Sequence, residues 1–126
     1  MKAMELVQQA YDGIVAIAAD GSEVSLSVYI GRMQRYAGVR EHHLAAAVRY
    51  DGLLRERTGA DKSLVLLGMC CMLATKFWDD ETLLNSYWAK IIGISPSDVN
   101  AYEQWVLEGI QYDLYDTTAV AMGVEG

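Results

Sequence analysis

The side chains of this sequence that could do chemistry lie in three short groups and one isolated position. Two adjacent cysteines, Cys70 and Cys71, could provide a nucleophile or a redox pair. The acids Asp79 to Glu81 could provide paired carboxylates, and the pair His42-His43 could contribute ligands to a metal ion. Lys76 lies near the end of an otherwise apolar stretch, where its amine needs water or a partner.

Simpler explanations account for the three groups. Adjacent cysteines point about 100° apart on a helix and give no disulfide framework or metal-ligand spacing with the histidines, so we expect buried core thiols. The pair His42-His43 is typical of a polar first turn, and the acids Asp79 to Glu81 are typical of the N-terminal end of a helix. We therefore predict no catalytic residue, no metal and no cofactor.

The composition favours one globular domain that binds another protein. The chain has 126 residues, of which 52% are hydrophobic, and carries a net charge of -7. Nucleic-acid binding depends largely on clustered Lys and Arg, so the acidic balance argues against it. The longest apolar run, Leu64 to Ala74, is shorter than the roughly 18 residues of a membrane span, and the N-terminus lacks the apolar core of a signal peptide. We expect an intracellular protein, cytoplasmic or nuclear.

The apolar periodicity predicts helices throughout, with no strand. Six helices are expected, at about 3–18, 25–37, 40–57, 62–78, 81–92 and 96–110. The fourth is apolar on all sides, which predicts that the other helices surround it and that Leu67, Cys70, Cys71 and Ala74 are buried. The fold class is therefore all-α with a single core.

Several finer expectations follow for individual helices. The first helix should bury Val7, Tyr11, Ile14 and Ala18, and Asp79 or Asp80 should cap the fifth. The sixth should begin at Ser95-Pro96 and bury a stripe on its inner face. This stripe consists of Val99, Tyr102, Val106 and Ile110. We also expect the three tryptophans to be packing residues: Trp78, Trp88 and Trp105.

Three segments of the sequence resemble the cyclin box. "LLGMCCMLATKFWDD" resembles the helix end "AAKF-DD" of cyclins, and "NSYWAKIIGIS" resembles their next helix and loop. "VNAYEQWVLEGIQYDL" resembles their fifth helix, and "AAVRYDGLL" looks like a weakened form of the "YIDRLL" helix. The match covers about residues 25 to 115. The closest pattern is that of the single-box cyclins of the P/U type, which include the phosphate-regulatory cyclins of fungi.

The resemblance implies a single five-helix cyclin box preceded by a short N-terminal helix. It divides the chain into an N-terminal helix and linker at 1–22, a cyclin box at 23–115 and a C-terminal tail at 116–126. It also implies a partner, a cyclin-dependent protein kinase, and a chain that is a monomer before it binds this kinase. The implied kinase-binding residues are Lys76, Glu103, Leu73, Phe77, Leu107, Tyr112 and Leu114.

The implied function is that of an activating regulatory subunit, which shifts the kinase C helix to its active position. An alternative is a cyclin-fold adaptor that does not activate a kinase, and a second is a small thiol enzyme around Cys70 and Cys71. Lys76 and Glu103 could also be a simple surface ion pair. For Leu73, Phe77 and Leu107, a place in the core is as compatible with the sequence as a place at an interface.

The sequence departs from the cyclin pattern at two places. Cyclins usually have Asp-Arg where this chain has Asp51-Gly52, so the bracing arginine is missing and another group must satisfy Asp51 unless it is exposed. The glycine also weakens the helix by about 1 kcal/mol relative to alanine. "SVYIGRMQRY" lacks the hydrophobic substrate-docking motif of mitotic cyclins, so no substrate-recruitment role is implied. The sequence does not identify the kinase or the pathway.

Overall fold

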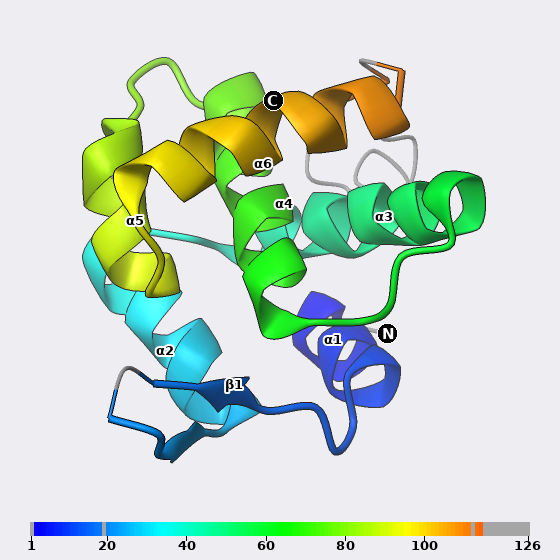
Figure 1. Ribbon diagram of the computed structural model, residues 1–126. Helices are drawn as coiled ribbons and strands as arrows, with labels where there is room; N and C mark the ends of the chain where they lie inside the picture. Colours follow the sequence, from blue (N-terminus) through cyan, green and yellow to red (C-terminus); the bar gives the residue numbers. More distant parts are fainter. Residues whose placement is uncertain (1, 19, 112, 115–126) are drawn as a thin grey trace.

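The computed structural model describes residues 2–18, 20–111, 113 and 114, which form six α-helices and one small antiparallel sheet (Figure 1). The elements are α1 (Ala3–Ala10), β1 (Ala16–Ile17), β2 (Glu23–Val24), α2 (Leu26–Ala37), α3 (Glu41–Thr58), α4 (Leu64–Trp78), α5 (Asn85–Ile92) and α6 (Pro96–Gly109). None of the helices described is long and apolar enough to cross a membrane.

Helix α4 is the centre of the domain, as its uniformly apolar sequence predicts. It packs against α2, α3, α5 and α6, and the side chains of Leu67, Cys70, Cys71 and Ala74 are fully buried. A Cβ atom added at Gly68 would lie 2.6 Å from the Tyr29 hydroxyl oxygen, so the glycine lets α2 approach α4 closely. The prediction of a single core around α4 is confirmed.

Local capping sequences set most of the helix ends. Ser25 and Ser95 are the N-caps of α2 and α6, and each side chain accepts a hydrogen bond from a backbone N–H of the first turn. Gly38, Gly59 and Gly93 adopt left-handed conformations after α2, α3 and α5, where a side chain would be strained. These ends lie within a residue or two of the predicted ones.

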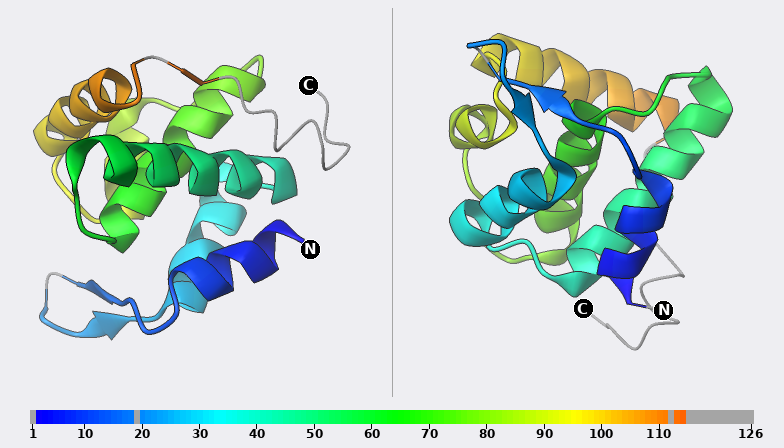
Figure 2. Two further views of the ribbon diagram at one scale, coloured as in Figure 1. Left: turned by 90° about the vertical axis from the view of Figure 1, so that its right-hand side faces the viewer. Right: turned by 90° about the horizontal axis from the view of Figure 1, so that it is seen from below.

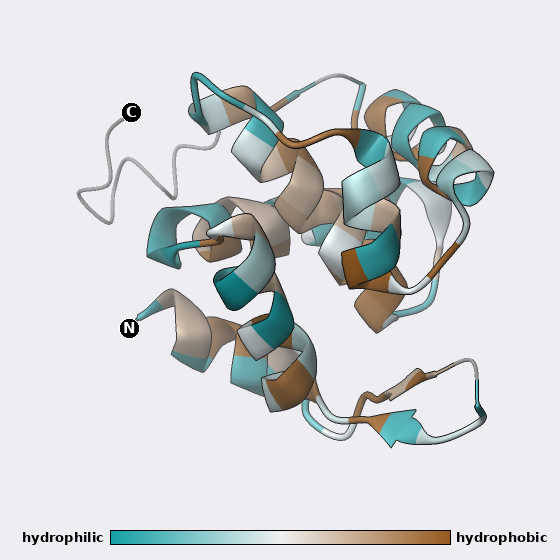
Figure 3. Cartoon of the chain, turned by 90° about the vertical axis from the view of Figure 1, so that its left-hand side faces the viewer, coloured by the Kyte–Doolittle hydropathy of each residue, from teal (hydrophilic) through white to brown (hydrophobic). Residues whose placement is uncertain are grey.

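The prediction of an uninterrupted helix over residues 3–18, and of no strand, was wrong. Helix α1 ends at Ala10, Gly13 has a left-handed conformation, and β1 then pairs with β2, with Ala16 opposite Val24 and Ile17 opposite Glu23. The strands have two residues each, too few for an alternating pattern to show in the sequence. The hairpin lies beside the start of α2 at the margin of the helices (Figures 1 and 3). It leaves the helical core intact.

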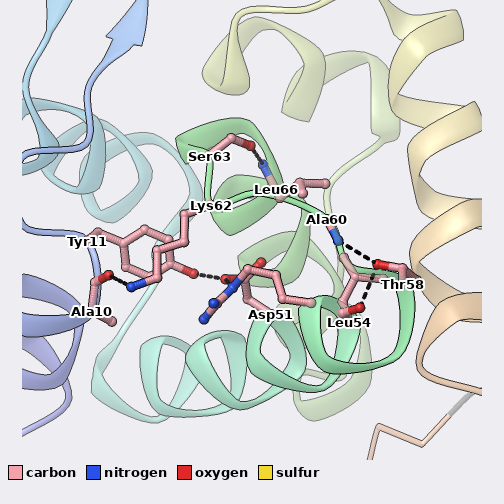
Figure 4. A network of polar contacts seen from close by, with 10 residues as sticks. Ala10, Tyr11, Asp51, Leu54, Thr58, Ala60, Lys62, Ser63 and Leu66 are labelled. Carbon is pink, nitrogen blue, oxygen red and sulfur yellow. Dashed lines mark hydrogen bonds and ion pairs between the residues drawn. The ribbon is translucent and has the colours of Figure 1, made fainter.

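Helix α1 is part of the core through its contact with α3. Its Val7 and the residue after its end, Tyr11, are fully buried, and α3 lies between α1 and α6 (Figure 2). The Tyr11 hydroxyl donates a hydrogen bond to the Asp51 carboxylate (Figure 4). The same carboxylate also accepts from Arg55 Nε at 3.0 Å. Asp51, left without the usual arginine of cyclins, is thus buried and held by these two donors.

The acids after α4 do not cap α5. Leu84 stands at the N-cap of α5, and Asp79 instead follows the last residue of α4, where its N–H donates to the Thr75 carbonyl oxygen. The Asp79 carboxylate bonds to buried His43 at 2.9 Å, across to the start of α3. The capping prediction was wrong because this contact joins residues 36 positions apart, which no local pattern reveals.

The burial predicted for the inner face of α6 was correct at three of four positions. Val99, Val106 and Ile110 are fully buried, whereas Tyr102 lies at the surface. Of the tryptophans, Trp88 is fully buried as predicted and Trp105 is exposed.

Candidate partner-binding surface

Lys76 and Glu103 meet at the junction of α4 and α6. The Lys76 ammonium lies 2.5 Å from Glu103 Oε2, and the two side chains keep 28% and 22% of their surface exposed. The structure therefore brings together the two charged residues that the sequence singles out. Because each remains partly accessible, both can also contact a partner that approaches this face.

Two asparagines complete the polar cluster and were missed by the sequence analysis. Asn85, the first residue of α5, accepts from the Lys76 ammonium and donates to Glu103 Oε1 at 3.0 Å. The same amide donates to Asn100 Oδ1 at 2.9 Å. Asn85 is invisible as a site residue in the sequence because it acts through tertiary contacts, whereas Asn100 stands in the N-x-x-E segment of α6 and could have been chosen from that motif.

Exposed apolar side chains lie close to this cluster in the chain. Phe77 is 41% exposed at the end of α4, and Leu84 is 76% exposed directly before Asn85. Leu83 and Tyr87 are also exposed. Exposed large apolar side chains that neighbour a partly buried ion pair in the chain are compatible with a protein-binding surface.

The other predicted apolar residues occupy different depths. Leu73 is buried in the core, so it is not exposed on this face in the free chain. Leu107 and Leu114 are half-buried and pack against the core, and the backbone carbonyl oxygen of Leu114 accepts from the Tyr50 hydroxyl. Tyr112 lies outside the described residues. The sequence analysis overlooked Leu83, Leu84 and Tyr87, for which exposure was the missing information.

The cysteines lack the environment of a reactive thiol. Burial raises the pKa of the Cys71 thiol to about 12, with a smaller contribution from the Asp51 charge. Burial likewise raises the pKa of Cys70 well above its ordinary value, and both residues are fully buried. A nucleophilic or redox cysteine needs an accessible thiolate, which neither position provides.

His42, His43 and Asp79 place three ligand atoms within 4.8 Å of one another, but the hydrogen bonds do not suit a metal ion. The Arg40 N–H donates to His43 Nδ1 at 2.9 Å, so Nε2 carries the proton and donates to Asp79. A metal at Nε2 would require that nitrogen to lose its proton. Burial, with the neighbouring His43 and Arg40, lowers the pKa of His42. The cluster is a structural tie between α3 and the end of α4.

The fold is that of a helical domain of the cyclin class. The sequence model of the Cyclin family matches residues 7–114, so the chain belongs to the cyclin family. Members of this family are regulatory proteins without catalytic activity of their own. The resemblance found in the sequence is confirmed.

A similar protein is the PHO85 cyclin-1 of Saccharomyces cerevisiae (strain ATCC 204508 / S288c). It is 30% identical to this chain over 98 residues, which cover 71% of the chain and 35% of the relative. The matched part of this chain thus corresponds to about a third of the length of that protein.

Proposed function

We propose that this chain is the regulatory subunit of a cyclin-dependent protein kinase of the PHO85 type. The observation that carries the proposal is the Lys76–Glu103 pair beside exposed Phe77, in a chain of the cyclin family with a PHO85 cyclin among its relatives. Lys76 and Glu103 are the positions at which the family resemblance implies contacts with kinase backbone.

The polar cluster has hydrogen-bonding capacity left for a partner. A lysine ammonium has three protons to donate. Among the described residues, the Lys76 ammonium donates to Asn85 Oδ1 and to Glu103 Oε2. The third proton can bond to a kinase carbonyl oxygen. The Glu103 carboxylate, with its two oxygens, can accept a kinase N–H besides Lys76 and Asn85.

The apolar residues would supply most of the buried area. Phe77 directly follows Lys76 in the chain and is exposed, and Leu107 is half-buried on α6, one turn beyond Glu103. The family resemblance adds Leu73, which is buried, Leu114, which is half-buried after α6, and Tyr112, which lies outside the described residues. Such a combination of apolar anchors and a shielded charge pair is typical of binding hot spots.

Activation requires that this surface fit one kinase state better than the other. If it is complementary only to the inward position of the kinase C helix, binding shifts the kinase toward the state with its catalytic Lys and Glu paired. The shift can be no larger than the difference in affinity for the two states. This chain supplies no catalytic group.

The test compares folding with kinase affinity in Lys76→Ala and Glu103→Ala. The pair is partly exposed and Asn85 stays with whichever partner remains, so we expect the free energy of unfolding to stay within about 1 kcal/mol of the parent. Kinase affinity should fall about 30-fold or more, corresponding to about 2 kcal/mol, because truncation leaves buried polar groups of the kinase unpaired. The measurements are urea unfolding and calorimetric titration with a PHO85-type kinase.

Glu108→Ala provides the control. This glutamate is exposed on α6, accepts from Gln104 within the same helix, and points away from Glu103, so its loss should leave kinase affinity nearly unchanged. A parallel loss of stability and affinity in Lys76→Ala would show a structural brace and refute the docking role. Phosphorylation of a peptide by the complex separates an activator from an adaptor, because an adaptor binds without raising the rate.

A further inference from the structure

The outer flank of α6 exposes two aromatic side chains that the proposed kinase surface does not use. Tyr102 is 37% exposed and Trp105 is 40% exposed, and their ring centroids lie 6.5 Å apart at an interplanar angle of 72°. Trp105 is two residues from Glu103, which on a helix turns it about 160° away. A kinase bound at Glu103 would therefore leave this flank accessible.

The aromatic pair borders a shallow hollow with an acidic group. Asp98, Ala101, Tyr102 and Trp105 line a space of about 410 Å³ on this flank. The other three residues follow Asp98 by three, four and seven positions, which places all four on one face of α6. Ala101 has the smallest of the four side chains, and exposed Asp98 supplies a carboxylate in the first turn.

The charges near this flank favour a cationic occupant. Asp98 and Glu108 are both on α6, and the chain has no lysine or arginine from residue 91 to its last residue, 126. A cation that enters the hollow thus meets the Asp98 carboxylate and the two aromatic rings, without a competing cation from this part of the sequence. Trp and Tyr rings attract cations through their faces, most strongly when Arg or Lys stacks on them.

We propose that this hollow binds an arginine side chain from an extended segment of a partner protein. The planar guanidinium can stack on Trp105 or Tyr102 and bond to both oxygens of Asp98, which a lysine ammonium cannot do. The site does not depend on kinase binding. It would give the chain a second protein contact, on the flank of α6 that faces away from Glu103.

The test uses the isolated chain and two five-residue peptides. One is acetyl-Gly-Ala-Arg-Ala-Gly-amide, and the other has uncharged citrulline in place of arginine. The indole N–H of Trp105 is followed by NMR in the labelled protein during titration. We expect the arginine peptide to shift this signal and to bind at least fivefold more tightly than the citrulline peptide.

Two variants with the same change in net charge identify the contribution of the carboxylate. Asp98→Asn should reduce affinity for the arginine peptide at least fivefold, whereas Asp12→Asn, at an exposed position after α1, should change it less than twofold. Equal binding of both peptides, equal effects of both variants, or no shift at Trp105 would each overturn the proposal. The kinase affinity of Asp98→Asn should equal that of the parent. If the arginine site is refuted, the kinase proposal therefore still stands, and if the kinase proposal is refuted, the arginine site still stands.

Discussion

Replacing Tyr11 with phenylalanine tests the buried contact between α1 and α3. The substitution removes one oxygen and keeps the ring that packs in the core, where Tyr11 is fully buried. Asp51 Oδ2 would then accept only from Arg55 Nε at 3.0 Å, since Oδ1 has no hydrogen-bond partner among the described residues. The carboxylate would lose one of its two donors.

The expected cost follows from the burial of Asp51. Hydrogen bonds to charged groups contribute about 1.5–3 kcal/mol, and a buried acceptor that loses its donor cannot replace it with water. We therefore expect Tyr11→Phe to lower the free energy of unfolding by about 2 kcal/mol, measured by urea denaturation. Tyr36→Phe is the matched control, because Tyr36 is half-exposed and its change should stay within about 0.5 kcal/mol.

A double-mutant cycle with Asp51→Ala, which removes the acceptor of the Tyr11 hydroxyl, separates this hydrogen bond from general packing. If Tyr11 acts through Asp51, the two substitutions should show a coupling of about 1 kcal/mol or more. A Tyr11→Phe effect no larger than that of Tyr36→Phe, or additive effects in the cycle, would refute the reasoning. In that case the Tyr11–Asp51 hydrogen bond would contribute little to the docking of α1, which is also held by its apolar contacts and by hydrogen bonds at Ala3 and Ala10.

Two further predictions concern the buried thiols. Cys70 and Cys71 are fully buried, so a thiol reagent should label native protein slowly and urea-unfolded protein rapidly, and fast native labelling of either would contradict their core role. The folded pKa of Cys71 is raised from 9.0 to about 12, so above pH 9 the unfolded chain loses this proton while the folded chain keeps it. The contribution of Cys71 to stability should therefore be constant below pH 9 and fall by about 1.4 kcal/mol per pH unit between pH 9 and 12. The measured stability should fall less steeply over this range in Cys71→Ala than in the parent, and equal slopes would contradict the assignment.

The sequence predicted the helices best where local chemistry decides their ends. Ser95 followed by proline, and the glycines at 38, 59 and 93, act through contacts within a few residues, so their effect is visible in the sequence. The central place of α4 was also predictable, because a helix without a polar face has to be surrounded.

The failures occurred where distant residues decide. Residues 14–18 look like a continuation of α1, but they pair with a second strand that the pattern does not reveal. Asp79 has the position of a cap for α5, yet it bonds to His43 on α3. In the candidate site, the family resemblance supplied Lys76 and Glu103, whereas Asn85 became recognisable only once the structure placed the start of α5 against both α4 and α6.

The polar cluster draws its residues from three helices, with Lys76 on α4, Asn85 on α5, and Asn100 and Glu103 on α6. No single segment of the chain can form it, and local opening of α5 alone would remove the group that bridges the other two. The polar cluster therefore exists only when all three helices are folded and packed. During synthesis it can form only after residue 103 has been made, so a partner that requires the cluster would not bind incompletely folded chains.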